Sequence, residues 1–187
     1  MFTRGFKSWC ENVALQVRRD LRLRAFDPLN PWALAEHLQI KVWNANQIPG
    51  LDPTCVEILF REDPDSWSAI TLYIETTALV ILNPSHSGGR PASDLTHELA
   101  HILLGHKAAR IDVSEYGFML NTYDRQQEEE ADWLSGCLLL PREALLFLRR
   151  QQMDQITVRQ TYGVSGEMFQ YRLNVTGVDR QLKQVKR

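Results

Sequence analysis

The sequence predicts an α+β protein in which a small, mostly antiparallel sheet packs on helices, followed by a helical C-terminal extension. Three observations support this. Apolar residues recur at three- and four-residue spacing in 4–24, 93–104 and 124–138, which is typical of amphipathic helices. Between residues 40 and 82, short β-branched and aromatic segments alternate with proline, glycine and aspartate turns. Near the end, two short helical patterns flank a glycine-containing turn.

The length and composition indicate a globular chain with room for one compact domain and a small appendage. It has 187 residues, of which 44% are hydrophobic and 24% charged. No apolar run is long enough for a membrane span, and the first residues lack a signal peptide, so we expect no membrane association and a cytoplasmic location. We divide the chain into 1–141, a main domain with N-terminal helices, and 142–187, a helical extension packed on it.

The individual elements follow from local pattern. Pro31 opens a short helix to Leu38, and residues 107–123 fit no single pattern. The polar tail from Asp179 is expected to fray. The predicted strands are Ile40–Trp43, Val56–Phe60, Ser68–Ile74 and Ala78–Leu82, and the predicted C-terminal helices are 142–152, 154–162 and 166–173.

The charges are unevenly distributed along the chain. Segment 27–141 has a net charge of −11, whereas the segments before and after it have +4 and +5. An acidic centre would attract cations or basic proteins, although the same charges could simply form a solvated surface. The three cysteines are widely spaced and predict neither a disulfide framework nor a cysteine-rich zinc module.

The most informative motif is H-E-x-x-H, formed by His97, Glu98 and His101 within a predicted helix. Residues four apart on a helix lie on one face, so both histidines can bind the same metal ion. Glu98 is next to the first ligand and can reach a water molecule on that ion. The motif therefore predicts a zinc site with a general base beside it.

A catalytic zinc site normally has a third protein ligand. His106 follows too closely to fold back easily, so it is a weak candidate. Glu128 and Asp132 share one face of the next helix, so the glutamate could bind the metal while the aspartate holds a ligand histidine. The neighbouring Glu129 and Glu130 are explained by a charged first helical turn.

These motifs resemble those of the ImmA/IrrE family of metallo-endopeptidases. The similarity lies in T-H-E-L-A-H-I-L-L-G-H and in E-E-E-A-D-W-L-S-G-C-L-L-L-P, and extends less specifically over residues 30–178. It implies a zincin-like core with one zinc ion bound by His97, His101 and Glu128, with Glu98 as general base and Asp132 supporting a ligand. It also implies a cytoplasmic protease that cleaves a helix-turn-helix repressor and so derepresses a stress-response or mobile-element regulon.

Peptide hydrolysis also needs a donor that stabilises the oxyanion. The sequence offers four candidates without choosing among them: Tyr116, Tyr123, His106 and Arg172. The strand Ala78–Leu82 could bind an extended peptide if it lies at the sheet edge, unless the chain itself covers that edge.

A different class of function competes with the protease. Residues 154–173 have the pattern of a helix-turn-helix, in which Gln170 and Arg172 could contact bases. The chain would then be a DNA-binding regulator whose zinc site acts as a sensor without cleaving. The alternative is a helical hairpin that packs on the catalytic domain through Val164, Met168, Phe169 and Leu173.

Overall fold

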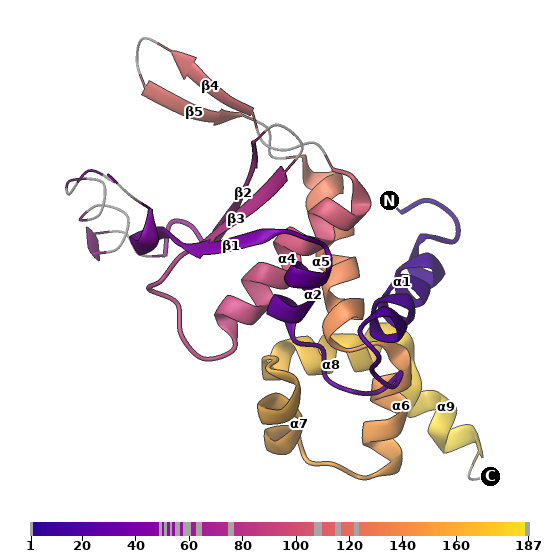
Figure 1. The fold of residues 1–187 in the computed structure, drawn as a ribbon. Coiled ribbons are helices and arrows are strands. Elements are labelled where there is room, and N and C mark those ends of the chain that lie inside the picture. Colours follow the sequence, from indigo (N-terminus) through magenta and orange to yellow (C-terminus); the bar gives the residue numbers. More distant parts are fainter. Residues whose placement is uncertain are drawn as a thin grey trace.

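The computed structural model describes residues 2–48, 50, 52, 54, 57, 61–62, 65–74, 77–106, 110–114, 117–121 and 124–185. A three-stranded sheet lies against helices, and further helices form the C-terminal region (Figure 1). This confirms the predicted α+β fold class. None of the helices in the described ranges is long and apolar enough to cross a membrane.

Two helices precede the sheet. α1 (Phe6–Asp20) buries Cys10, Ala14 and Val17 on one face, as its periodicity predicts. α2 (Pro31–His37) begins after Asn30, whose side chain accepts a hydrogen bond from the backbone N–H of Trp32 at 3.0 Å. The proline at its first position has no N–H to leave unpaired, so this helix starts where the sequence predicts.

The sheet has the strand order β1-β3-β2, in which β1 (Lys41–Asn44) pairs parallel with β3 (Thr77–Leu82), and β2 (Ala69–Ile74) pairs antiparallel with it. A 3₁₀ turn, Ala45–Gln47, follows β1. β3 is central and buried from Ala78 to Leu82. The suggested edge position of this strand is therefore wrong, and the edge strands of this sheet are β1 and β2.

Two segments of the sequence prediction, 56–60 and 107–123, are only partly described by the structure. The expected strand Val56–Phe60 lies outside the described residues except for Glu57, which is helical and pairs with Arg61 at 3.1 Å. Within the ambiguous segment 107–123, β4 (Arg110–Ser114) and β5 (Gly117–Asn121) form an antiparallel pair.

α4 (Arg90–Leu104) and α5 (Arg125–Leu139) pack against each other, and α5 also packs on α1. α4 begins three residues earlier than predicted, because Pro91 is compatible with a first helical turn. Asp124 caps α5 by accepting from the N–H of Gln126 at 2.9 Å. The buried faces of both helices meet the sheet in one apolar cluster, so the two helices that carry the predicted site are held rigidly.

The C-terminal helices enclose a second apolar cluster, which includes Phe169, Leu173 and Val178. The predicted fraying from Asp179 is wrong, because Asp179 pairs with Arg149 at 2.8 Å and the chain is helical there. The division of the chain at residue 141 stays a prediction. These helices are α6 (Arg142–Arg150), α7 (Gln155–Tyr162), α8 (Gly166–Thr176) and α9 (Val178–Val185).

Arg172 joins this helical region to the rest of the protein. It is fully buried, donates from Nε to the carbonyl of Leu140 at 3.0 Å and from Nη2 to Glu11 Oε1 at 2.5 Å. A Cβ atom at Gly136 would lie 3.1 Å from Arg172 Cδ, so the glycine leaves space for the arginine. These contacts make Arg172 a structural residue that is closed off from DNA bases.

Candidate metal centre

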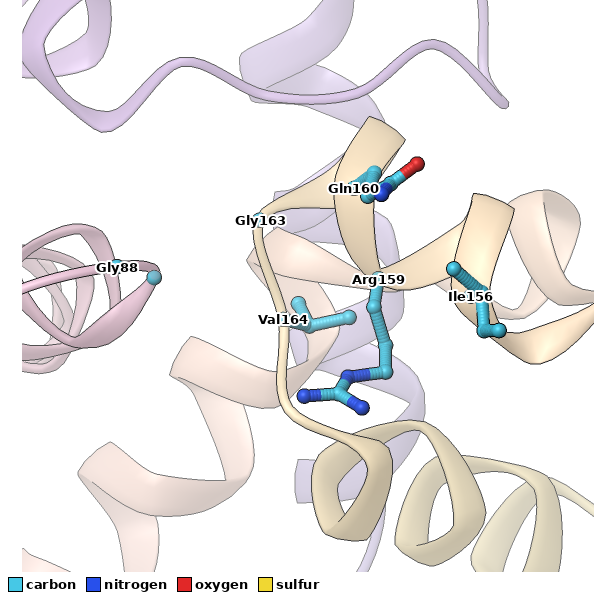
Figure 2. Close-up of a pocket in the computed structure, with 7 residues that line it drawn as sticks. Gly88, Ile156, Arg159, Gln160, Gly163 and Val164 are labelled. Atoms are coloured by element: carbon cyan, nitrogen blue, oxygen red, sulfur yellow. The ribbon is translucent and has the colours of Figure 1, made fainter.

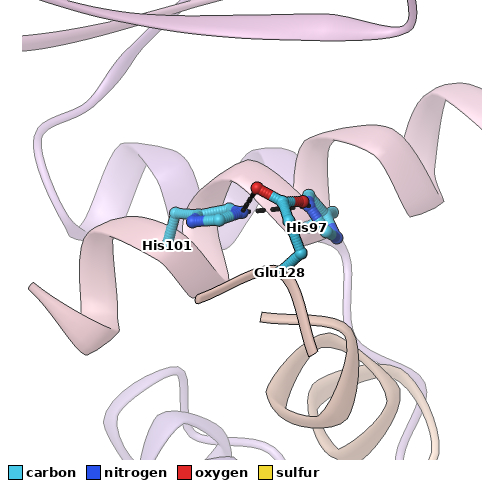
Figure 3. A group of neighbouring side chains, drawn as sticks. All are labelled: His97, His101 and Glu128. Atoms are coloured by element: carbon cyan, nitrogen blue, oxygen red, sulfur yellow. Dashed lines mark hydrogen bonds and ion pairs between the residues drawn. The ribbon is translucent and has the colours of Figure 1, made fainter. Parts of the chain in front are cut away.

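Three side chains from two helices converge on one point. His97 and His101 lie one turn apart on α4, and Glu128 reaches them from the first turn of α5 (Figure 3). The Nε2 atoms of the histidines are 3.0 Å apart. Glu128 Oε2 lies 3.2 Å from His97 Nε2, and Glu128 Oε1 lies 3.5 Å from His101 Nε2. This is the arrangement expected from the three motif residues.

The donor set fits zinc. Ligand atoms about 2.0–2.1 Å from a tetrahedral zinc ion are separated by about 3.3 Å from one another, and the three observed separations lie close to that value. Two imidazole nitrogens and one carboxylate, with room for a further ligand, are also the usual protein donors of a catalytic zinc ion. The group could therefore hold one metal ion.

His97 is held in the orientation that a ligand needs. Its Nδ1 lies 3.1 Å from Asp132 Oδ1, so Nδ1 can donate to the carboxylate while Nε2 keeps a lone pair for a metal. Burial lowers the pKa of His97, but Asp132, Glu98 and Glu128 outweigh burial and leave the pKa raised. The aspartate is thus close enough for the supporting role that the helix spacing indicates.

The second ligand histidine has the opposite electrostatic balance. Burial, together with the nearby His97, lowers the pKa of His101 to about 4. A low pKa favours the neutral imidazole, which is the form that binds metals. Repulsion between the two rings therefore disfavours a charge on both, whereas both can be neutral ligands.

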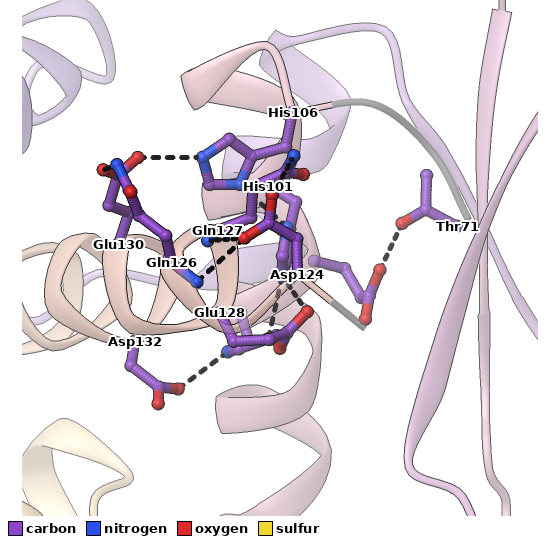
Figure 4. A network of polar contacts seen from close by, with 11 residues as sticks. Thr71, His101, His106, Asp124, Gln126, Gln127, Glu128, Glu130 and Asp132 are labelled. Atoms are coloured by element: carbon purple, nitrogen blue, oxygen red, sulfur yellow. Dashed lines mark hydrogen bonds and ion pairs between the residues drawn. The ribbon is translucent and has the colours of Figure 1, made fainter. Parts of the chain in front are cut away.

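Glu98, the residue after His97, contacts the edge strand β2. The hydroxyl of Thr71 on β2 donates to Glu98 Oε2 (Figure 4). Burial raises the pKa of Glu98, although the Thr71 hydrogen bond and the nearby His97 act in the other direction. A carboxylate with a raised pKa accepts and returns a proton more readily near neutral pH.

A cavity of about 350 Å³ opens beside these residues. It brings the sheet edge, α4, α5 and α8 together at one place. Its walls are formed by Ser68, Ala69, Ser93, Asp94, His97, Glu98, Asp132, Ser135 and Met168. The cavity thus reaches His97 and the neighbouring Glu98.

Of the four candidate oxyanion donors, the structure describes Arg172 and His106. Tyr116 and Tyr123 lie outside the described residues. Arg172 is buried against Glu11, because its guanidinium closes the junction between helices. His106 is hydrogen-bonded to the Nδ1 side of His101, opposite the ligand atom. Neither Arg172 nor His106 is among the residues that line the 350 Å³ cavity.

Sequence reasoning missed three polar residues around the site: Thr71, Tyr73 and Glu130. Thr71 and Tyr73 are two residues apart on β2 and so lie on the same face of the strand. The sequence, however, holds no signal for which strand reaches Glu98. Glu130 Oε2 lies within hydrogen-bond distance of His106 Nε2, at 3.3 Å, whereas the sequence suggested a solvated charge in the first helical turn. The signal that could have found it is Gly105, which reverses the chain after α4.

A second pocket, of about 480 Å³, lies between the loop before α4 and the turn from α7 to α8 (Figure 2). A Cβ atom at Gly89 would lie 2.7 Å from the carbonyl oxygen of Gly163, so only glycine allows this close approach. Arg159 is the single charged side chain among its described lining residues. The pocket lacks the histidine and carboxylate groups that distinguish the metal centre.

The α+β fold and the two-histidine, one-glutamate group define a zincin-like protein. A model of the peptidase M78 family, described as the IrrE N-terminal-like domain, matches residues 56–174, and the chain belongs to this family. A comparison with curated protein sequences gave no match.

Among solved structures, the chain is similar to a Mycobacterium tuberculosis transcriptional regulator, with a TM-score of 0.50 and 15% sequence identity. The similarity covers 92% of this chain and 56% of the regulator, so the chain spans little more than half of that protein. At this identity the likeness concerns the fold alone.

Proposed function

We propose that this protein is a zinc-dependent endopeptidase of the ImmA/IrrE type. The observation that carries the proposal is the convergence of His97, His101 and Glu128 next to Glu98 and a cavity. When bound there, zinc would supply Lewis-acid activation of water and of a peptide carbonyl. Membership of the peptidase M78 family supports the same chemistry.

In this proposal Glu98 is the general base. Its raised pKa suits it to take a proton from the attacking water and to pass that proton to the leaving amine. Thr71 orients the carboxylate by donating to Oε2, and Asp132 orients His97. These residues keep the base and the ligand in place before the substrate arrives, which lowers the cost of reaching the transition state.

The edge strand β2 is our candidate for binding the substrate backbone. One side of β2 pairs with β3, and a peptide could add to the other side as a further strand. Tyr73 is a suitable donor to the developing oxyanion, because it shares the face of Thr71 and is 45% exposed. Burial raises its pKa and the charge of Glu98 raises it further, so the phenol keeps its proton.

For the substrate we propose a helix-turn-helix repressor, from the family resemblance. Such repressors are basic, and the net charge of −11 in segment 27–141 would favour their approach. A repressor substrate would place the reaction in the cytoplasm, and its cleavage would release a stress-response or mobile-element regulon. Identification of the cleaved protein decides this part of the proposal.

The test is Glu98→Gln, which keeps the size of the side chain but removes the base. Loss of general acid–base catalysis should reduce cleavage by at least about 100-fold. Zinc content, measured by metal analysis, should remain equal to that of the parent. Cleavage at the parental rate would overturn the mechanism.

The same variant can serve as a trap in the source cell. We expect an intact helix-turn-helix protein to accumulate on Glu98→Gln, to be identified by mass spectrometry, and to be cut when the parent protein is added. A trapped protein of another class, cut by the parent, would overturn the repressor proposal while leaving the peptidase intact.

A second candidate function is DNA binding with the zinc site as a sensor. α7 and α8 flank the turn 163–165 as in a helix-turn-helix, and the similar solved structure is named a transcriptional regulator. Of the two residues suggested to contact bases, Gln170 is exposed but Arg172 is buried. DNA binding by the full chain that weakens steeply with salt, without any cleavage, would favour this alternative.

A further inference from the structure

His106 folds back onto the ligand His101, although the two residues are only five apart. Gly105 adopts the left-handed conformation, with φ of 67°, and ends α4. The N–H of Gly105 donates to the carbonyl of Ile102 and the N–H of His106 to that of His101, both at 3.0 Å. This is a Schellman motif, which brings the side chain two positions past the helix end against the last turn. Here that contact joins two imidazoles.

The two rings are linked through their Nδ1 atoms, which lie 2.9 Å apart. On the other side of His106, Nε2 lies 3.3 Å from Glu130 Oε2 (Figure 4). The remaining oxygen of this carboxylate accepts from Gln126 at 2.9 Å. The side chains of His106 and Glu130 are only 8% and 16% exposed, so water competes weakly for these contacts.

The hydrogen-bond donors and acceptors then allow only one placement of the protons on the two imidazole rings. If Nε2 of His101 keeps its lone pair for a metal, its proton is on Nδ1 and is donated to His106 Nδ1. His106 must carry its own proton on Nε2, where Glu130 accepts it. The carboxylate of Glu130 thus acts on His101 through His106.

The other ligand histidine has a simpler support. His97 contacts Asp132 directly, but the side chain of Asp132 is 73% exposed. An exposed carboxylate is screened by water and holds its partner weakly. The contact between His101 and Glu130 is indirect, because it passes through His106, but it is better shielded from water.

We propose that His106 and Glu130 are positioning residues that fix the tautomer and orientation of His101 for metal binding. This inference rests on the proposed zinc site and deepens it. α5 then supplies one ligand, Glu128, and two further carboxylates, each of which supports a different histidine of α4. Outer partners of this kind change metal affinity by about 10- to 100-fold when removed.

The first measurement is zinc affinity, determined on the full chain by competition with a chromogenic chelator. His106→Phe removes the relay and should weaken zinc binding by about 10- to 100-fold. Glu130→Gln should weaken it by about tenfold. His106→Gln, whose amide can both accept and donate, should retain more affinity than His106→Phe. Glu129→Gln is the matched control, because Glu129 pairs only with Arg125 among the contacts of the described residues, and should bind like the parent.

The second measurement is the tautomer of His106 in the zinc-loaded parent, from long-range ¹H–¹⁵N spectra. The relay requires a proton on Nε2, so a proton on Nδ1 would overturn it even if a variant failed to fold. Unchanged zinc affinity in both His106→Phe and Glu130→Gln would also overturn it. Failure of the parent to bind zinc would instead defeat the proposed function on which the relay rests.

Discussion

The two ends of α5 hold charged groups in different ways. At the first turns, Glu128 and Asp132 face His97, and no lysine or arginine of the described residues pairs with either carboxylate. Past the last turn, the carbonyl of Leu140 and the carboxylate of Glu11 surround the guanidinium of Arg172. In the second cluster the protein itself supplies the partners of Nε and Nη2, and only the buried Nη1 has none among the described residues, whereas the first cluster would be completed by a cation from outside. The comparison suggests that polar clusters closed on themselves stabilise the fold, and that those left open bind ligands.

The largest effect is expected at the C-terminal end of α5, where Arg172 and Glu11 form an ion pair. Arg172→Met leaves Glu11 without its buried cationic partner, although the Glu11 side chain is 23% exposed and still accepts from the N–H of Arg142. We therefore expect a cost towards the lower end of the about 3–5 kcal/mol that removing one member of a buried pair causes. Urea unfolding should show this loss in the free energy of unfolding, while zinc affinity stays within about twofold of the parent. The double variant Glu11→Met with Arg172→Met should recover much of the loss, because no unpaired charge remains. A large change in zinc affinity in the single variant would break the distinction between the two ends.

At the N-terminal end of α5, Glu128→Ala removes a proposed ligand and should weaken zinc binding by more than about 100-fold, which exceeds the usual effect of residues that only support a ligand. Zinc should raise the melting temperature of the parent and not that of the variant, because only bound metal stabilises the folded state. Calorimetry with and without a chelator measures this. Equal zinc stabilisation of both proteins would mean that the third ligand has been wrongly assigned.

A smaller effect is expected from the exposed support of His97. Asp132→Asn keeps the shape of the side chain and leaves an oxygen that can still accept, so zinc affinity should fall by no more than about tenfold. The competition assay used for Glu130→Gln also ranks Asp132→Asn and His106→Phe by zinc affinity. If Asp132→Asn lost more affinity than His106→Phe, direct contact would matter more than burial.

The smallest effect is expected from Glu129→Ala, one residue from the proposed ligand. Its side chain is 44% exposed and pairs with the exposed Arg125. We expect a change in the free energy of unfolding below about 0.5 kcal/mol and unaltered zinc binding. Zinc loss equal to that of Glu128→Ala would show that the acidic turn acts as a whole rather than through one carboxylate.

Local pattern predicted the helices well because each has an apolar face and a defined start or end, such as Pro31 or Gly105. It also predicted which side chains could share a metal, since i and i+4 positions lie on one face whatever the helix packs against. Local pattern could not predict the strand order, because β3 is central through its pairing with β1 and β2, which lie in other parts of the chain. The predicted fraying after Asp179 failed for the same reason, since Arg149 is thirty residues away.

By itself, the sequence determined the fold class, because helical and strand patterns follow one another along the chain. It also determined the H-E-x-x-H helix and the shared face of Glu128 and Asp132, because these depend on the period of a single helix. Tertiary structure decided which strand meets Glu98, and that Glu130 contacts His106, which in turn contacts His101. It also decided that Arg172, an arginine with two suggested roles on sequence grounds, fills the interior. Helical periodicity sets the direction of a side chain around its own axis. Only the packing of one element on another sets what that side chain meets.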